Sequence, residues 1–187
     1  MIITSVLRRT IAAVLLILMS PFLIIIWFTI KFTDPSLPAF FQQIRIGYQG
    51  RPYAIWKMRS MNTVSSIEPV TSDDDPRITP IGRFIRRSHL DELIQILNVT
   101  NGTMKFIGPR SKLQHESKEA TATVPGWERR HDELPGITGL KQVFGRTDDY
   151  RVEAVFDRLW RMRRKSVCFR LWIIYKTAIR VLGMGGQ

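Results

Sequence analysis

Two adjacent carboxylates, Asp91 and Glu92, combine the residue types and the spacing that chemistry on a phosphate group requires. Arg86 and Arg87 lie a few residues before them, and the apolar pattern that follows predicts a helix whose first turn contains both acids. The positive end of a helix and nearby guanidinium groups keep a carboxylate ionised and attract phosphate oxygens. An ionised carboxylate can attack phosphorus and form an acyl phosphate. We therefore interpret Asp91 as a candidate nucleophile.

Glu92 would have a different task, because neighbouring side chains on a helix diverge by about a hundred degrees. It could hold a magnesium ion that bridges a diphosphate. Acidic residues in the first turn of a helix also complement the helix dipole without any further function. From the residues alone, both interpretations of the pair stay open.

Three further basic residues could complete a phosphate site. Lys57 and Arg59 end an extended segment, and Arg110 follows a Gly-Pro turn. Arginine is the better phosphate ligand, because its planar guanidinium can donate two parallel hydrogen bonds. Each of these residues alone is more often a solvated surface charge. The chain contains no Walker loop, dinucleotide-binding glycine motif, zinc-ligand spacing or Gly-x-Ser-x-Gly elbow that would suggest another reaction.

Two short helices must position the acids. Apolar residues alternating with arginines predict one helix from Ile81 up to Ser88. Ser88 is expected to cap a second helix, with Asp91 at the third position of a capping box, and residues 98–102 are expected to end it. The buried stripe of this second helix consists of Leu90, Leu93, Ile94 and Leu97.

The first thirty residues contain an apolar run that is long enough to reach across a membrane. No charged residue occurs from Thr10 to Ile30, and about twenty such residues can cross a bilayer core as a helix. Pro21, at the centre of the run, removes a backbone donor and predicts a kink, and the Ser20 hydroxyl can satisfy a freed carbonyl. Basic residues flank both ends, so charge gives no orientation. A kinked spanning helix and a re-entrant helix that returns to the same side both fit these residues.

The last segment of the chain is strongly basic and amphipathic. The net charge of the chain is +12, and from residue 151 onward the basic residues face only Glu153 and Asp157. Such a segment needs an anionic partner, and the membrane run favours lipid headgroups over nucleic acid. We predict basic amphipathic helices at the membrane interface over residues 151–187. The single cysteine, Cys168, cannot form an internal disulfide and is expected to be a small packing residue.

The rest of the sequence predicts a small mixed domain. With 187 residues, the chain has room for one catalytic domain and a membrane element. The predicted fold class is α+β and mainly helical, with residues 1–33 in the membrane, 34–150 as a cytosolic catalytic core and 151–187 at the interface. Within the core we expect a linker at 34–39, followed by a short hairpin or a pair of extended segments with a turn at Gly47 and Gly50. We also expect a loop at 62–76 whose acids Asp73 to Asp75 are solvated, and turns at 108–110 and 135–139.

Taken together, these features resemble the small monotopic polyprenyl-phosphate phosphoglycosyl transferases of the bacterial sugar transferase family. The matching strings stand in the family's order and cover most of the chain. They are the apolar run with Ser20-Pro21, then Phe40–Gly47, Lys57–Met61, Arg77–Arg87, Leu90–Leu93, Gly108–Arg110, and Pro135–Gly139 followed by Gln142-Val143 and Gly145-Arg146.

The resemblance implies that Asp91 attacks the β-phosphate of a UDP-sugar, releases UMP and passes the sugar phosphate to a polyprenyl phosphate such as undecaprenyl phosphate. It assigns Glu92 to Mg²⁺. It also implies a re-entrant helix that breaks at Ser20-Pro21 and an active site at the cytoplasmic face of the bacterial inner membrane, where the product starts lipid-linked glycan or polysaccharide synthesis. The residues it assigns to phosphate or nucleotide contacts are Arg86, Lys57, Arg59 and Arg110.

The chain departs from the family pattern at Ile94, Ser111 and Arg170, where proline, proline and aspartate are usual. The alternative function is a noncatalytic membrane-surface scaffold that binds anionic partners, and the joint presence of Asp91, Glu92 and the arginines argues against it. The residues do not identify the sugar, the downstream glycan or the oligomeric state, so a homodimer stays open.

Overall fold

The structure, a computed structural model, describes residues 2–62, 75–145, 147, 149–181 and 183. The chain forms two compact units, residues 1–43 with 55–100 and residues 44–54 with 101–187. The described residues are mainly helical with two small sheets, as the sequence predicts. Most of the predicted loop at 62–76, including Asp73 and Asp74, lies outside the described residues.

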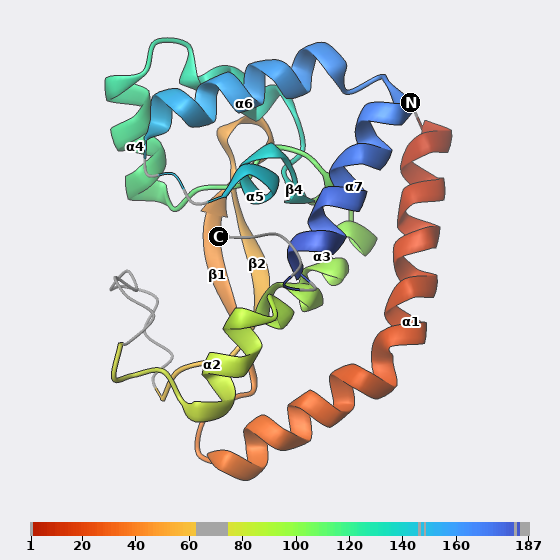
Figure 1. The fold of residues 1–187 in the computed structure, drawn as a ribbon, viewed down its shortest axis with the longest axis vertical. Coiled ribbons are helices and arrows are strands. Elements are labelled where there is room, and N and C mark those ends of the chain that lie inside the picture. Colours follow the sequence, from red (N-terminus) through yellow and green to blue (C-terminus); the bar gives the residue numbers. More distant parts are fainter. Residues whose placement is uncertain (1, 63–74, 146, 148, 182, 184–187) are drawn as a thin grey trace. The chain divides into compact units, whose positions relative to one another are not determined.

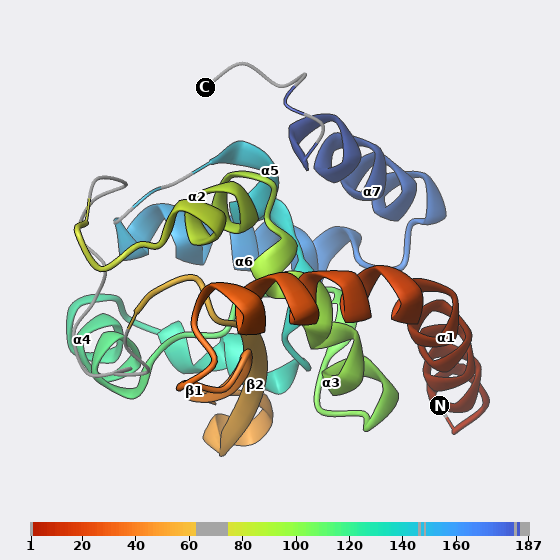
Figure 2. The same ribbon diagram turned by 90° about the horizontal axis from the view of Figure 1, so that it is seen from below.

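The first unit begins with a long apolar helix, α1 (Ile2–Thr33). Its side chains are largely exposed, and within the described part of the chain it is the one helix long and apolar enough to cross a membrane. The ribbon of α1 bends partway along its length (Figures 1 and 2), and Pro21 lies inside it. The Ser20 hydroxyl donates to the carbonyl of Ile17 at 2.7 Å, the group to which a residue at position 21 would otherwise donate. The predicted kink and its compensating hydroxyl are therefore confirmed, although the helix remains continuous.

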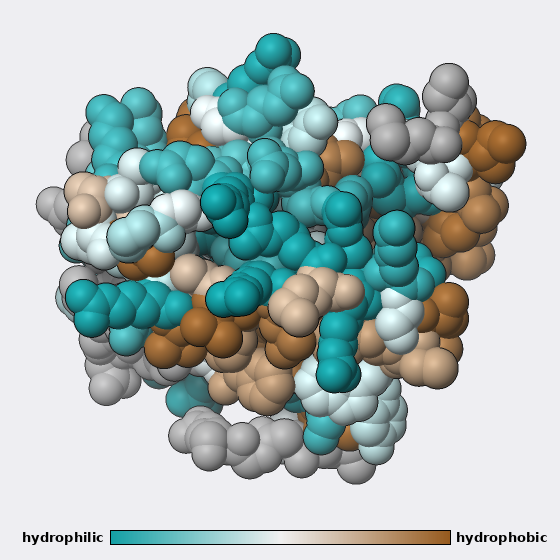
Figure 3. Space-filling view, turned by 90° about the horizontal axis from the view of Figure 1, so that it is seen from above, coloured by the Kyte–Doolittle hydropathy of each residue, from teal (hydrophilic) through white to brown (hydrophobic). Residues whose placement is uncertain are grey.

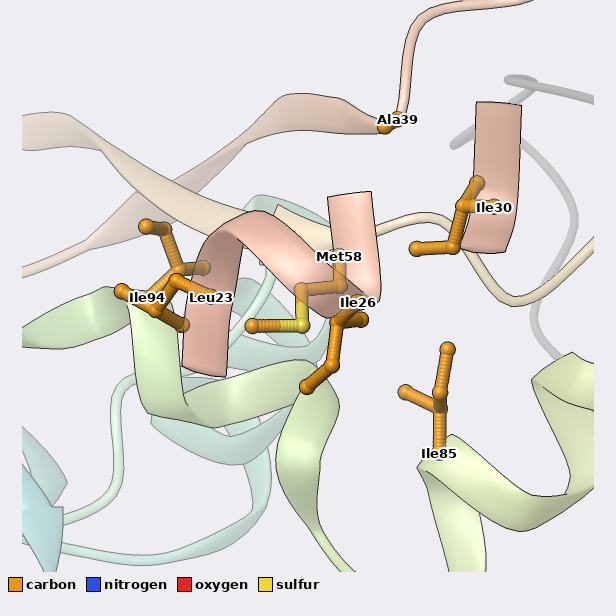
Figure 4. Packing of buried hydrophobic residues seen from close by; sticks show 7 residues of the cluster. All are labelled: Leu23, Ile26, Ile30, Ala39, Met58, Ile85 and Ile94. Carbon is orange, nitrogen blue, oxygen red and sulfur yellow. The ribbon is translucent and has the colours of Figure 1, made fainter. Parts of the chain in front are cut away.

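The C-terminal half of α1 supplies one side of the core of this unit. Leu23, Ile26 and Ile30 are each less than a tenth exposed, and they pack in one cluster with Ile85 of α2 (Pro80–Arg87) (Figure 4). The same cluster contains Ala39, Met58 of β2 (Pro52–Met58) and Ile94 of the 3-10 helix η2 (Leu90–Gln95). The short helix α3 (Ile96–Thr100) continues from η2. Apolar residues of α1 thus hold the segment that carries Asp91 and Glu92.

The predicted hairpin is confirmed. Strand β1 (Phe40–Ile46) pairs with β2, and the turn contains the 3-10 helix η1 (Tyr48–Gly50). The N–H of Gly47 donates to the carbonyl of Arg51 at 2.9 Å, which closes the turn. Residues 44–54, at the tip of the hairpin, belong to the second unit.

The second unit contains a parallel strand pair surrounded by helices. Strand β3 (Lys105–Ile107) pairs with β4 (Gly136–Thr138), with Lys105 opposite Gly136 and Ile107 opposite Thr138. One apolar cluster centres on Ile107, Leu140, Trp160 and Ile173, and a second contains Ala120, Val124 and Trp127. The helices are α4 (Gln114–Thr123), the 3-10 helix η3 (Trp127–Asp132), α5 (Leu140–Phe144), α6 (Tyr150–Arg163) and α7 (Val167–Val181).

The predicted C-terminal helices are present as α6 and α7. Most of their basic side chains are exposed, and the view from the α6 side of the molecule shows mainly hydrophilic residues (Figure 3). Each helix also buries one face: Trp160 of α6 and Ile173 of α7 belong to the core. Cys168 is exposed, so the expectation that it packs inside is wrong. It lines an open groove of about 620 Å³ with Phe144, Phe169 and Trp172.

Candidate functional site

Asp91 and Glu92 lie in the first turn of η2, and both side chains are half-buried. The sequence places them correctly at the start of a helical segment. The predicted cap is wrong: the Ser88 hydroxyl donates to the carbonyl of Phe84 at 2.7 Å and so ends α2. His89 takes the position before η2, with a left-handed backbone (φ 55°) that turns the chain between the two helices. The Ser88 side chain is directed back to the preceding turn, and among the described residues no side-chain hydrogen bond caps the start of η2.

Arg86 and Arg87 occupy the last turn of α2, directly before the turn to η2. Asp75 lies ahead of α2 and is buried, and Arg77 donates to its carboxylate at 2.7 Å. Hydrogen bonds from the side chain and then the backbone N–H of Arg77 lower the pKa of Asp75 to about 2, and the charge of Arg86 acts in the same direction. The prediction of solvated acids is therefore wrong for Asp75, because it anchors the entry into α2.

A close backbone approach places the segment containing Lys57 beside α2. A Cβ atom on Gly82 would lie 1.8 Å from the carbonyl oxygen of Ser60, so only glycine allows this contact. The N–H of Thr79 donates to that same carbonyl at 3.1 Å. On the other side, the carboxamide of Asn98 accepts from the N–H of Trp56 at 3.1 Å. The first unit thus brings the strand end with Lys57, the end of α2 with Arg86 and the turn with Asp91 into one packed assembly.

Arg59 has a different environment from the other predicted phosphate ligands. Its side chain is only 4% exposed, and it donates to the carboxylate of Asp34 and to the carbonyl of Asp34, each at 2.7 Å. A third contact reaches the carbonyl of Ile30 in the last turn of α1 at 3.4 Å. Arg59 therefore fixes the end of α1, and its role in phosphate binding stays a prediction.

Arg110 belongs to the second unit, where it follows the turn at Gly108 and Pro109. A Cβ on Gly136 would lie 2.1 Å from the nitrogen of Gly108, so these two motif glycines let the turn and β4 meet backbone to backbone. The side chain of Arg110 is half-buried and lines a small cavity with Arg130 and His131. Burial lowers the pKa of His131 below 6.5, and the charge of Arg130 adds to the effect.

A buried group of charges lies beneath this turn, and the sequence prediction missed it. Glu153 is 1% exposed and pairs with the ammonium groups of Lys112, at 2.8 Å, and Lys141. Arg130 is 5% exposed, and its Nε lies 3.2 Å from Asp157. The available signal was the spacing of Glu153 and Asp157, four residues apart on one face of a helix that is otherwise basic.

Within the described residues, no group of three or more His, Cys, Asp and Glu side chains could hold a metal ion by itself. Mg²⁺ is commonly held by one or two carboxylates together with substrate phosphates and water. Asp91 and Glu92 provide two adjacent carboxylates in one half-buried turn. One carboxylate, that of Glu92, is enough for a magnesium ion that would arrive with a diphosphate, so Asp91 need not be a ligand.

The sequence model of a family described as bacterial sugar transferase matches residues 1–184. The exopolysaccharide production protein PSS of Rhizobium leguminosarum bv. phaseoli is 34% identical over 183 residues, a match that covers 91% of this chain and 90% of that protein.

Two relatives with longer chains carry names that state a reaction. The UDP-glucose:undecaprenyl-phosphate glucose-1-phosphate transferase of Escherichia coli K12 is 37% identical over 179 residues, covering 90% of this chain and 38% of that protein. The undecaprenyl-phosphate galactose phosphotransferase of Salmonella typhimurium LT2 is 34% identical over 190 residues, covering 92% and 39%. The chain therefore spans about two fifths of the length of these two relatives.

Proposed function

Because the chain belongs to the bacterial sugar transferase family, we propose that it transfers a sugar 1-phosphate from a UDP-sugar to a polyprenyl phosphate and releases UMP. The observation that carries this proposal is the pair Asp91 and Glu92 in a half-buried turn that directly follows the arginine-rich end of α2. The names of the relatives, which specify glucose or galactose phosphate and undecaprenyl phosphate, support the same reaction class.

The proposed chemistry has two displacements at one phosphorus atom. The Asp91 carboxylate attacks the β-phosphorus of the UDP-sugar, the bond to the bridging oxygen breaks, and UMP leaves. A polyprenyl phosphate oxygen then attacks the phosphorus of the aspartyl phosphosugar, which frees Asp91 and gives a polyprenyl diphosphate sugar. The two steps conserve all atoms and require no oxidant or reductant.

The other residues bind and orient the diphosphate. Arg86 and Lys57 lie in the same unit as Asp91. Both are assigned to the phosphate oxygens of the diphosphate. Arg110 and Arg59 are assigned to phosphate or nucleotide contacts on the basis of the motif. Glu92 is assigned to Mg²⁺, which when bound would neutralise charge on the diphosphate.

The membrane arrangement is part of the proposal. We place α1 as a re-entrant helix that bends at Ser20-Pro21 and returns to the cytoplasmic face of the inner membrane. The exposed basic residues of α6 and α7 favour anionic lipid headgroups as neighbours. This placement brings the active site to the depth at which the lipid phosphate lies.

The decisive experiment measures UMP release and the covalent intermediate separately. The purified full-length chain is incubated with Mg²⁺ and UDP-glucose, UDP-galactose and further UDP-sugars, with and without undecaprenyl phosphate. Wild type should release UMP, and without the acceptor its intact mass should increase by one sugar phosphate. Asp91→Asn should do neither.

Asp132→Asn is the matched control, because Asp132 is also a carboxylate on a 3-10 helix but is exposed and outside the proposed site. It should behave as wild type. UMP release by Asp91→Asn would refute Asp91 as the nucleophile. The absence of UMP from the wild type with every sugar tested would refute the proposed transfer and favour the noncatalytic scaffold.

A further inference from the structure

The Arg130 guanidinium contacts the turn that carries Arg110 from the interior of the second unit. Its Nη2 donates to the carbonyl of Arg110 at 2.7 Å, across a separation of 20 residues in the sequence. The guanidinium carbon lies 3.9 Å from the centre of the Trp127 ring. A flat, desolvated cation stacked on an aromatic ring has little freedom to move. Arg130 therefore fixes the position of one backbone carbonyl in the turn.

Two acids of α6 hold Arg130 in this orientation. Its Nε lies 3.2 Å from Asp157, and its Nη1 lies 3.8 Å from Glu153. Burial raises the pKa of Asp157 to about 6, an effect that the charge of Arg130 opposes. The fork of the guanidinium thus reaches a carboxylate on one side and the turn carbonyl on the other, which the point charge of a lysine cannot do.

The same charge group fixes the chain just after Arg110. Lys112 is 5% exposed, its ammonium lies 2.8 Å from Glu153, and its carbonyl accepts from the N–H of Ile46 at 2.8 Å. The carbonyl of Ser111 accepts from Arg45 at 2.7 Å. Consecutive backbone groups at positions 110, 111 and 112 are therefore each held by a contact from a distant part of the unit.

Stability alone is a poor explanation for this arrangement. Buried ion pairs rarely stabilise a protein more than well-packed apolar residues would, because desolvation offsets most of their attraction. What they do provide is a defined geometry. Here these contacts hold the backbone of residues 110–112, from which the Arg110 side chain extends.

We propose that Arg130, held by Asp157 and Glu153, is a positioning residue that fixes the turn from which Arg110 contacts the nucleotide sugar. The inference rests on the proposed function, since it takes Arg110 as a phosphate or nucleotide ligand. Arg130 itself does not touch the substrate and acts through Arg110.

A double-mutant cycle on substrate binding tests this inference. The binding of UDP-glucose with Mg²⁺ is measured by calorimetry on the full-length chain with Asp91→Asn, so that no chemistry occurs. Arg110→Ala should weaken binding about tenfold or more, as expected for a lost hydrogen bond to a charged group. Arg130→Lys, which keeps the charge but loses the fork, should weaken binding severalfold.

The affinity of the double variant shows whether Arg130 acts through Arg110. If Arg130 acts through Arg110, then adding Arg130→Lys to Arg110→Ala should change the affinity by less than about twofold. If the two losses multiply, or if Arg110→Ala alone has no effect, the inference is wrong. Arg129→Lys is the matched control, because Arg129 is the exposed neighbour on the same 3-10 helix, and it should bind as the parent does.

Two further measurements distinguish a failure of this inference from a folding defect and from a failure of the proposed function. If thermal unfolding shows that Arg130→Lys does not fold, Asp157→Asn takes its place in the cycle, because it removes the negative charge that pairs with Nε with little change in volume. The release of UMP by the otherwise unmodified chain tests the proposed function independently. UMP release together with multiplicative losses would overturn the inference and leave the proposed function intact.

Discussion

The guanidinium of Arg59 lies 2.7 Å from the carboxylate of Asp34 and also binds two carbonyls at the end of α1. One side chain thus joins the end of β2 to the segment where the chain leaves the long apolar helix. This contact gives Arg59 a structural role beside the phosphate contact that its motif implies.

Arg59→Ala is expected to lower the free energy of unfolding by about 2 kcal/mol, because it removes a buried donor from two carbonyls. Thermal unfolding in detergent measures the change, with Arg83→Ala, an exposed arginine of the same unit, as the control. The affinity of Arg59→Lys for UDP-glucose then distinguishes the two roles. Because lysine keeps the charge, an unchanged affinity would show that substrate binding does not depend on the guanidinium group of Arg59.

Gly82→Ala should disrupt the contact between α2 and the segment that follows Lys57. The added methyl group would meet the carbonyl of Ser60 at 1.8 Å, and such overpacking costs about 2 kcal/mol or more. Gly50→Ala is the control: its φ of 69° is unfavourable for alanine by about 1 kcal/mol, but no atom lies within 4 Å of the new methyl group. Equal losses of unfolding free energy in the two variants would contradict this account.

His131 should lower the stability of the chain as the pH falls below 6.5, whereas Asp157, whose pKa is raised to about 6, should act in the opposite direction. Burial and the charge of Arg130 lower the pKa of His131 in the folded protein, so the unfolded chain binds more protons in this range. The unfolding midpoint is measured between pH 7.5 and 5.5 (about two units around the ordinary histidine pKa). His131→Gln should show a shallower decrease than wild type, whereas the same change at the exposed His115 should not. If the unfolding midpoint changes with pH equally in wild type and His131→Gln, His131 is not the cause of the pH dependence.

The proposed re-entrant helix predicts that both ends of α1 lie on the cytoplasmic side. In a Cys168→Ser background, Thr4→Cys and Ser36→Cys are labelled separately with a membrane-impermeant maleimide, in right-side-out and inverted vesicles. Both should react only in inverted vesicles, as the exposed Cys168 of the native chain should. Labelling of the two positions from opposite sides would show a spanning helix instead. Pro21→Leu should shift part of the population to that pattern, because it restores the backbone donor that proline lacks.

Sequence alone determined the features that depend on neighbouring residues. The charge-free run with Ser20 and Pro21 predicts a bent apolar helix, because proline lacks a donor wherever it occurs. Glycines spaced around a turn predict the hairpin, and the apolar stripe after Asp91 predicts that this residue starts a helical segment. These patterns act over one or two turns, so the residues themselves contain the necessary information.

Tertiary structure decided which polar groups meet. Ser88 could cap either of two helices by its type, and its bond to Phe84 settled the choice. By its type Arg59 is a surface cation, but the carboxylate of Asp34, 25 residues earlier, pairs with it in the interior. The pair of Lys112 and Glu153 joins residues 41 positions apart. A charge is costly to bury without a partner, and whether a distant partner is within reach depends on how the chain folds, which no local pattern records.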